Sequence, residues 1–158
     1  MEKSSNFDSV KSPFLNTNKK TTIMGILNVT PDSFSDGGNF IRPSNALKHA
    51  ENLIREGADI IDVGGESSRP GSSPVTTAEE LKRVIPVINL IKKNFPDILV
   101  SIDTYKSEVA SEAISFGADL VNDITGLKGC DKMASLISKT KVPIVIMHMR
   151  GKPKNMQD

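Results

Sequence analysis

Short apolar runs alternate with helix-like spacings along the chain from about residue 22 onward. Apolar runs of strand length cover residues 22–27, 58–63, 98–102, 118–121 and 143–147. Between them, apolar residues recur three or four positions apart, as at Leu47, Ala50 and Leu53, which is the spacing of a helix with one buried face. The pattern predicts five strands alternating with four helices, as in parallel α/β proteins.

The predicted helices carry signals at their ends. We expect helices over 44–56, from Thr77 onward, over 106–116, and from 131 to about 140. Thr77 and Glu80 form a capping-box pattern at the start of the second helix, and Pro86 is expected to kink that helix. Asp131 is expected to cap the last one.

One internal repeat supports the same architecture. Residues 56–62 read Glu-Gly-Ala-Asp-Ile-Ile-Asp, and residues 116–122 read Phe-Gly-Ala-Asp-Leu-Val-Asn. In both, a glycine that ends a helix precedes a strand that closes on a polar side chain. The repeat indicates successive βα units of a parallel sheet.

Polar side chains are expected to converge at one edge of this sheet. Asn28, Asp62, Asp103, Asn122 and His148 each stand at the C-terminal end of a predicted strand. Because ligands bind at that edge in parallel α/β folds, convergence from five strands favours a (β/α)8 TIM barrel. An open sheet of the flavodoxin type is the alternative fold, and the long loop after residue 63 fits it poorly.

Only part of such a barrel is expected from this chain. A complete barrel needs eight units and typically about 250 residues, whereas the chain has 158 residues and about five strands and four helices. We therefore expect residues 21–158 to form the N-terminal part of a longer barrel, or a partner to supply the rest. Residues 1–20 are polar and are expected to form a flexible leader without fold.

The loop after the first strand carries candidate chemistry. The side-chain oxygen of Asn28 is a neutral ligand suited to a hard cation such as Mg2+, which keeps waters and uses substrate phosphates as further ligands. Pro31 stiffens the loop entry, and Phe34 is expected to cover an aromatic substrate. The alternative is a strand followed by a well-capped turn.

The loop over residues 64–71 is rich in glycine, which lets the backbone approach a ligand. Ser67 and Ser68 offer hydroxyl groups, and Arg69 offers a planar donor fork that suits phosphate oxygens. Taken alone, the same residues also describe a flexible loop with a solvated arginine.

Asp103 and Asn122 end neighbouring predicted strands. An ionised Asp only accepts hydrogen bonds, whereas an Asn amide both donates and accepts. The pair can therefore hydrogen-bond to a heterocycle that offers both donors and acceptors. The alternative is that Asp103 caps the following helix and that Asn122 satisfies loop backbone. His148 lacks a second ligand at metal-binding spacing, so core packing or a hydrogen bond at the barrel mouth is the favoured role.

Composition narrows the class of protein. The chain is 37% hydrophobic and 25% charged, with a net charge of +1, which is typical of one soluble domain. Near-neutral charge gives no reason to expect nucleic acid or an anionic membrane as partner. There is no apolar stretch of membrane-spanning length and no signal-like segment, and the single Cys130 fits a reducing cytoplasm.

Residues 22–153 resemble dihydropteroate synthase along their length. The strings at 28–38 and 64–71 are specific to that family, and shorter matches at 103–104, 122–124 and 147–149 are shared with related pterin-binding domains. The resemblance implies a (β/α)8 barrel, usually dimeric, that acts in folate synthesis and is inhibited by sulfonamides. The implied reaction condenses 6-hydroxymethyl-7,8-dihydropterin pyrophosphate with p-aminobenzoate to give 7,8-dihydropteroate and pyrophosphate.

The resemblance also implies residue roles. Asn28 is implied to bind Mg2+ and the pyrophosphate, and Arg69 is implied to hold the leaving pyrophosphate. Asp103 and Asn122 are implied to hold the pterin, and the p-aminobenzoate pocket is implied to be formed by Phe34, Ser68 and Pro70. Pyrophosphate is implied to leave early, so that the arylamine traps a pterin-stabilised cation and no protein nucleophile is needed.

Two departures from the family pattern matter. Ser68 stands where Thr is common, and the family's further Asp, Lys and Arg–His pair from later strands are absent, so the chain alone is expected to be inactive. Two other functions compete: a pterin-binding methyltransferase-type domain, and a non-catalytic fragment or assembly partner. Pyrophosphate release would distinguish the first, because methyl transfer releases none.

Overall fold

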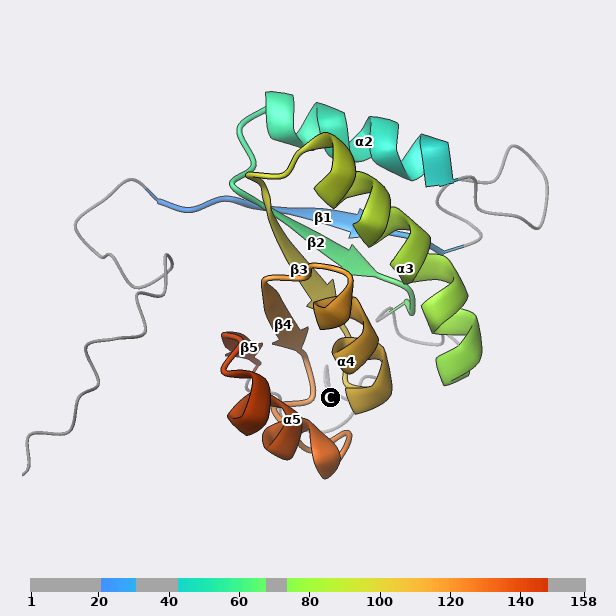
Figure 1. Ribbon diagram of the computed structural model, residues 1–158, viewed down its shortest axis with the longest axis vertical. Coiled ribbons are helices and arrows are strands. Elements are labelled where there is room, and N and C mark those ends of the chain that lie inside the picture. The colour runs from blue at the N-terminus through green and yellow to red at the C-terminus, as the bar shows by residue number, and fades with distance from the viewer. Residues whose placement is uncertain (1–20, 31–42, 68–73, 148–158) are drawn as a thin grey trace, which may run out of the picture.

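The computed structural model describes residues 21–30, 43–67 and 74–147, whose strands form one parallel sheet in the order β1-β2-β3-β4-β5 (Figure 1). The strands are β1 (Met24–Asn28), β2 (Ile60–Gly64), β3 (Leu99–Asp103), β4 (Leu120–Asp123) and β5 (Ile144–Ile146). The helices in these residues are α2 (Pro43–Arg55), α3 (Thr77–Asn94), α4 (Ser107–Ser115) and α5 (Lys132–Thr140).

Every neighbouring pair of strands is parallel, and the order in the sheet follows the order in the chain. This is the arrangement of successive units in a (β/α)8 barrel, so the predicted fold class is confirmed. The flavodoxin-type alternative is wrong, because that sheet contains a reversal of strand order.

The two faces of the sheet differ in what covers them. One face carries Leu27, Val63 and Ile102, which are fully buried in a core that the helices complete (Figure 1). On the opposite face, the outer strands are exposed, Ile26 of β1 by 52% and Val145 of β5 by 45%, whereas Asp62, Ser101 and Leu120 on the central strands are buried. That second face corresponds to the interior of a closed barrel. The described strands therefore resemble one side of a barrel, without the strands of the other side.

The internal repeat adopts the same local structure twice. Its glycines both have left-handed backbone conformations after a helix: Gly57 at φ +104° and Gly117 at φ +101°. Asp59 Oδ2 accepts a hydrogen bond from Ile23 N at 2.8 Å, and Asp119 Oδ2 accepts one from Val100 N at 2.8 Å. Each aspartate therefore attaches the start of its own strand to the strand that precedes it in the sheet.

Two expected helix signals differ in detail from the structure. Thr76, not Thr77, caps α3, and its side chain accepts from Glu79 N at 3.2 Å, while Glu80 is buried. Asp131 stands at the N-cap of α5 without a capping hydrogen bond from its side chain. Pro86 lies within α3, and its expected kink stays a prediction.

Within the described ranges, no helix is both long enough and apolar enough to cross a bilayer.

Candidate functional site

The parallel register aligns four positions at the C-terminal edge of the sheet. Asn28 pairs with Gly64, Gly64 with Asp103, and Asp103 with Asn122. Residues in register on parallel strands lie on the same face, and for this row it is the face opposite the helices. The structure therefore brings together Asn28, Asp103 and Asn122, three of the five polar side chains that the sequence placed at strand ends, whereas Asp62 lies two residues before the end of β2.

Gly64 leaves a gap within this row. A Cβ atom at Gly64 would lie 3.4 Å from Asn28 Oδ1 and 3.4 Å from Asp103 Oδ2. The side chains of Asn28 and Asp103 thus flank a position where the backbone alone lines the surface. A flat ligand can approach the sheet edge closely at this point.

A second polar layer lies beneath the row. Asp62 stands two residues before Gly64, in register with Ser101, and the exposed fractions of the two residues are 1% and 0%. Asn122 Nδ2 donates to Asp62 Oδ2 at 2.9 Å, which fixes the orientation of the amide. Asp62 Oδ1 and Ser101 Oγ have no hydrogen-bond partner among the described residues.

The side chains expected to converge at the strand ends therefore lie at two levels: Asn28, Asp103 and Asn122 form the upper row, and Asp62 lies one layer below. Burial raises the pKa of Asp62, and the amide of Asn122 and the nearby Ser101 hydroxyl oppose that shift.

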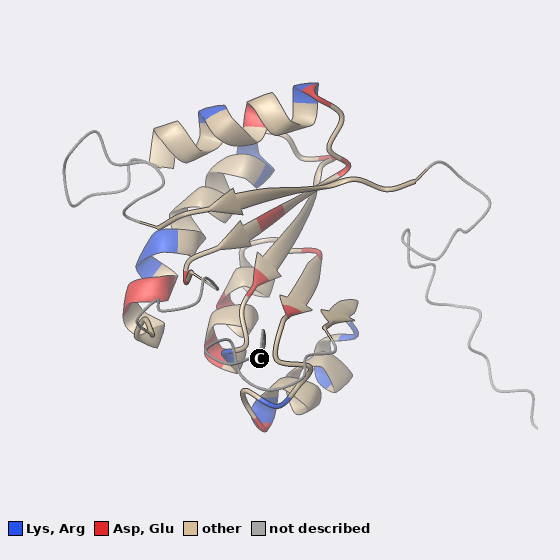
Figure 2. Ribbon diagram, turned by 180° about the vertical axis from the view of Figure 1, so that it is seen from behind, with Lys and Arg blue, Asp and Glu red and all other residues tan. Residues whose placement is uncertain are grey.

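Asp103 faces a strongly acidic environment. Burial, together with the charges of Asp62, Glu80, Asp123 and Glu66, raises the pKa of Asp103 to about 7. Figure 2 shows acidic positions on β2, β3 and β4 and no basic position on any of the strands. The edge therefore favours a ligand that presents N–H donors or positive charge.

The alternative roles considered for Asp103 and Asn122 are wrong. Lys106 is the N-cap residue of α4, and its backbone N–H is bound by Thr104 Oγ1 at 3.1 Å, so Asp103 does not cap this helix. The amide of Asn122 donates to Asp62 rather than to loop backbone. Asp103 thus has no helix-capping role, and Asn122 binds the buried carboxylate of Asp62 in place of loop backbone.

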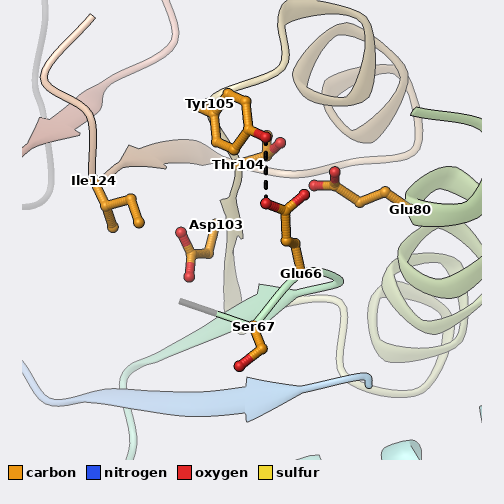
Figure 3. A pocket seen from close by; sticks show the side chains of 7 residues that line it. All are labelled: Glu66, Ser67, Glu80, Asp103, Thr104, Tyr105 and Ile124. Atoms are coloured by element: carbon orange, nitrogen blue, oxygen red, sulfur yellow. Dashed lines mark hydrogen bonds between the residues drawn. The ribbon is translucent and has the colours of Figure 1, made fainter. Parts of the chain in front are cut away.

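A small pocket opens beside Asp103 between the loops that follow β2, β3 and β4 (Figure 3). Its volume is about 30 Å3, and its lining residues are Glu66, Ser67, Glu80, Asp103, Thr104, Tyr105 and Ile124. Figure 3 shows the carboxylates of Glu66 and Glu80 directed toward each other, with the Tyr105 hydroxyl donating to Glu66 Oε1 at 3.2 Å.

Several of these residues were not predicted from the sequence. Glu80 is four residues before Val84 and eight before Ile88, both fully buried, so helical spacing alone indicated a carboxylate on the buried face. Lys106, which binds both Glu66 and Glu80, carried no comparable signal.

Asp123 was also missed, and it shapes the loop after β4. It is fully buried, with Oδ1 accepting from Thr125 N at 2.8 Å and Oδ2 accepting from Leu127 N at 2.9 Å. An Asp two residues before a Thr is a recognised turn pattern, so a local signal for this role existed in the sequence.

The chemistry at Asn28 fits a weakly held magnesium ion. Asn28 is exposed at the sheet edge and offers a neutral oxygen beside the gap at Gly64. Among the described residues, no three His, Cys, Asp or Glu side chains are grouped so that they could hold a metal. A single amide oxygen suits Mg2+ when water and phosphate oxygens complete its shell.

The remaining predicted site residues, Phe34, Ser68, Arg69, Pro70 and His148, lie outside the described residues, as does the expected leader over residues 1–20.

Comparison with known proteins gives consistent matches over most of the chain. The chain is 54% identical over 141 residues to the dihydropteroate synthase of Clostridium beijerinckii, covering 89% of this chain and 52% of that enzyme. It is 53% identical to the dihydropteroate synthase of Bacillus subtilis, covering 89% of this chain and 49% of that enzyme. The chain thus spans about half the length of these curated relatives.

Solved structures match in the same way. The dihydropteroate synthase of Clostridium difficile, crystallised in the presence of pteroic acid, aligns with a TM-score of 0.79 at 55% identity, covering 84% of this chain and 50% of that one. The Xanthomonas albilineans enzyme with 4-aminobenzoic acid aligns with a TM-score of 0.79 at 43% identity, covering 85% and 49%. The family model described as pterin binding enzyme matches residues 24–158, and the chain belongs to this family.

Proposed function

We propose that this chain supplies the N-terminal half of the active site of a dihydropteroate synthase. The observation that carries the proposal is the row of Asn28, Gly64, Asp103 and Asn122, which offers a carboxylate, an oriented amide and a gap between them. Relatives of known structure, one determined in the presence of pteroic acid and one with 4-aminobenzoic acid, support the same ligand chemistry.

The pterin ring is proposed to lie against Asp103 and Asn122. Its amino and ring N–H groups would donate to the Asp103 carboxylate, and its carbonyl and ring nitrogens would pair with the Asn122 amide. Because Asp62 already holds one N–H of Asn122, the amide oxygen and the second N–H stay oriented for the ligand. Buried, pre-oriented polar groups of this kind discriminate strongly against rings with the wrong edge.

The acidic edge is proposed to stabilise positive charge on the pterin as the diphosphate leaves. Asp103, Asp62 and Asp123 place carboxylates around this position, where a partly buried site strengthens their effect. The C–O bond breaks first and diphosphate leaves, the aromatic amine then attacks the methylene carbon to form the C–N bond, and the amine nitrogen loses its extra proton to solvent or to the released diphosphate. No protein nucleophile takes part.

The diphosphate is proposed to be held by Asn28 and Arg69. Asn28 would be a ligand of Mg2+, which when bound neutralises charge on the leaving group. The guanidinium of Arg69 suits diphosphate oxygens in a bidentate arrangement. Phe34, Ser68 and Pro70 are proposed to form the p-aminobenzoate pocket.

The active assembly is proposed to need a C-terminal half-barrel, either in the same polypeptide or in a partner chain. The outer edges of β1 and β5 lack a neighbouring strand among the described residues, and Ile26 and Val145 expose apolar surface beside them. Both edges suit further parallel strands. A homodimer and a cytoplasmic location belong to the same proposal, and no observation favours the methyltransferase-type alternative.

Pyrophosphate release tests the proposal directly. The chain is mixed with a polypeptide carrying the C-terminal half of the Clostridium beijerinckii relative and with both substrates, and it is also assayed alone. We expect release that requires both the dihydropterin ester and p-aminobenzoate, and that Asp103→Ala reduces at least about a hundredfold while leaving the fold intact. Arg69→Ala is expected to weaken binding of the pyrophosphate ester.

The other outcomes identify the competing functions. Pterin binding without turnover in any mixture would indicate a non-catalytic fragment. Absence of pterin binding in every mixture would exclude the proposed role altogether.

A further inference from the structure

An ion-pair cluster joins the loops around Asp103. The ammonium group of Lys106 hydrogen-bonds both Glu66 Oε2 and Glu80 Oε2. The exposed fractions of the three side chains are only 12% for Lys106, 19% for Glu66 and 1% for Glu80. Since Glu66 follows β2, Glu80 lies in α3 and Lys106 precedes α4, the cluster ties together three separate segments.

Glu66 is the centre of further contacts. Its Oε2 accepts from Val75 N at 3.2 Å and its Oε1 accepts from Tyr105 Oη at 3.2 Å. The Lys106 ammonium also lies 4.8 Å from the centre of the Tyr105 ring, at cation–π distance. Three groups thus bind one carboxylate: the N–H of Val75, the hydroxyl of Tyr105 and the ammonium of Lys106.

The turn between Gly64 and Glu66 is packed closely against α3. A Cβ atom at Gly65 would lie 2.8 Å from Val84 Cγ1 and 2.9 Å from Glu80 Cγ, so the backbone has no room to move toward the helix. Arg83 Nη1 donates to Gly65 O at 2.9 Å from the same helix. Holding Glu66 therefore also holds Gly64, the gap in the row between Asn28 and Asp103.

The cluster also supplies two of the four charges that act on Asp103. The groups acting on Asp103 are Asp62 from β2, Glu66 after β2, Glu80 from α3 and Asp123 from β4. Lys106 is paired with two of these four, and it leaves Glu80 Oε1 as a buried oxygen with no hydrogen-bond partner in the described residues. Removing the ammonium would leave both carboxylates uncompensated beside the site.

We propose that Lys106 is a positioning residue of the pterin site. By holding Glu66 and Glu80 together, it keeps the turn 64–66 in place beside Asp103 and limits the negative charge that Asp103 faces. The identity of the ring as a pterin depends on the proposed function. The effect on Asp103 does not, because it can be measured without ligand.

The chain offers a matched control for removing a lysine. Lys92 pairs with Asp119 Oδ2 at 3.1 Å and is 22% exposed, but it lies at the opposite, N-terminal end of the strands. Lys92→Met and Lys106→Met therefore delete the same charge from a comparable ion pair. Only Lys106→Met deletes it next to Asp103.

The test uses Lys106→Met, Lys106→Arg and Lys92→Met in the full chain. The titration of the Asp103 carboxyl is followed by carbon-13 NMR, and the dissociation constant for 7,8-dihydropterin is measured with the chain alone and with the complementing half-barrel. We expect Lys106→Met to move the Asp103 titration to higher pH and to weaken dihydropterin binding about tenfold or more. Lys106→Arg restores most of the affinity, and Lys92→Met changes neither quantity.

An Asp103 titration and dihydropterin affinity that stay unchanged in Lys106→Met would overturn the role of Lys106. Equal weakening by Lys92→Met would also overturn it, since the effect would then be one of general stability. If Lys106→Met does not fold, Glu80→Gln/Lys106→Met removes the buried unpaired charge, and it is still expected to bind about tenfold more weakly because Glu66 has lost its partner. Wild-type affinity in that variant counts against the proposal.

These outcomes separate the two proposals. A wild-type protein that binds no dihydropterin in any mixture contradicts the proposed function. The Asp103 titration in the Lys106 variants still decides the positioning role in that case.

Discussion

Two neighbouring glycines show how much individual residues matter at the sheet edge. Gly64 and Gly65 look alike in the sequence, where both belong to a glycine-rich loop. In the structure, Gly64 leaves space beside Asn28 and Asp103, whereas Gly65 is pressed against Val84 and Glu80 of α3. One glycine thus serves the ligand surface and the other serves packing.

Alanine at each glycine should separate these two duties. We expect Gly65→Ala to lower the free energy of unfolding by about 1–3 kcal/mol, because its methyl group would overlap the side chains of Val84 and Glu80 in α3. Gly64→Ala should change stability little and weaken dihydropterin binding, since its methyl group fills the gap. Urea unfolding and a binding titration check both effects, and equal stability losses would contradict the assignment.

The carboxyl group of Asp103 should make stability depend on pH. Its pKa is raised from 3.8 to about 7 in the folded chain, so between these values the folded state binds more protons than the unfolded state. The contribution of Asp103 is therefore most favourable below about pH 4 and declines as the pH rises to about 7.

Asp103→Asn removes this titration. The variant should gain stability over the wild type as the pH rises from 5 to 8, up to about 2 kcal/mol at the upper end, after allowing for screening by solvent. Urea unfolding at a series of pH values measures the difference, with Asp97→Asn at an exposed position as the control. A difference that does not vary with pH would contradict the raised pKa.

The repeated Gly-Ala-Asp unit shows how neighbouring strands of the sheet are joined at their starts. The sequence showed that a helix-ending glycine and a strand start occur together twice, and the structure adds that each aspartate bonds the preceding strand in the sheet. Asp119 additionally binds Lys92, while Asp59 Oδ2 receives the N–H of Ile23, a residue that is 47% exposed. The two units are alike in geometry and unequal in burial.

Burial should decide what each aspartate contributes. Asp119→Ala leaves the N–H of Val100, a fully buried residue, without its partner and is expected to cost about 2–3 kcal/mol. Asp59→Ala should cost about 1 kcal/mol or less, because water can replace the lost partner at Ile23. Chemical denaturation of the two variants gives the comparison, and equal losses would show that burial does not control the contribution.

For the whole molecule, the open barrel wall has the largest consequence. Ile26 and Val145 are exposed on the face that a complete barrel encloses, and the chain spans about half the length of its curated relatives. Apolar surface and unpaired strand edges of this kind favour association with further strands.

A charge on this face should therefore block completion of the barrel. Val145→Lys is expected to weaken binding of the C-terminal half-barrel at least about a hundredfold, because the ammonium group would be enclosed without a partner. Glu51→Lys places the same residue on an exposed position of α2 and provides the control. Isothermal titration calorimetry measures both, and equal affinities would show that this face is not the contact surface.

The sequence by itself determined the alternation of strands and helices, the parallel class of fold and three of the four described polar residues that it placed at strand ends, Asp62 being the exception. These features are local: apolar spacing sets the elements, and the polar residue that ends each strand marks one edge of a parallel sheet. Helix starts were less certain, as at Thr76 and Thr77, because neighbouring residues of the same type compete for the cap.

Only the tertiary structure decided which of these residues share a level and what charge surrounds them. Strand register placed Gly64, not Asp62, between Asn28 and Asp103, and helix packing brought Glu80 and Lys106 to the same site. Register and packing depend on contacts between segments far apart in the chain, and burial sets the strength of every charge among them. No local pattern in the sequence contains that information.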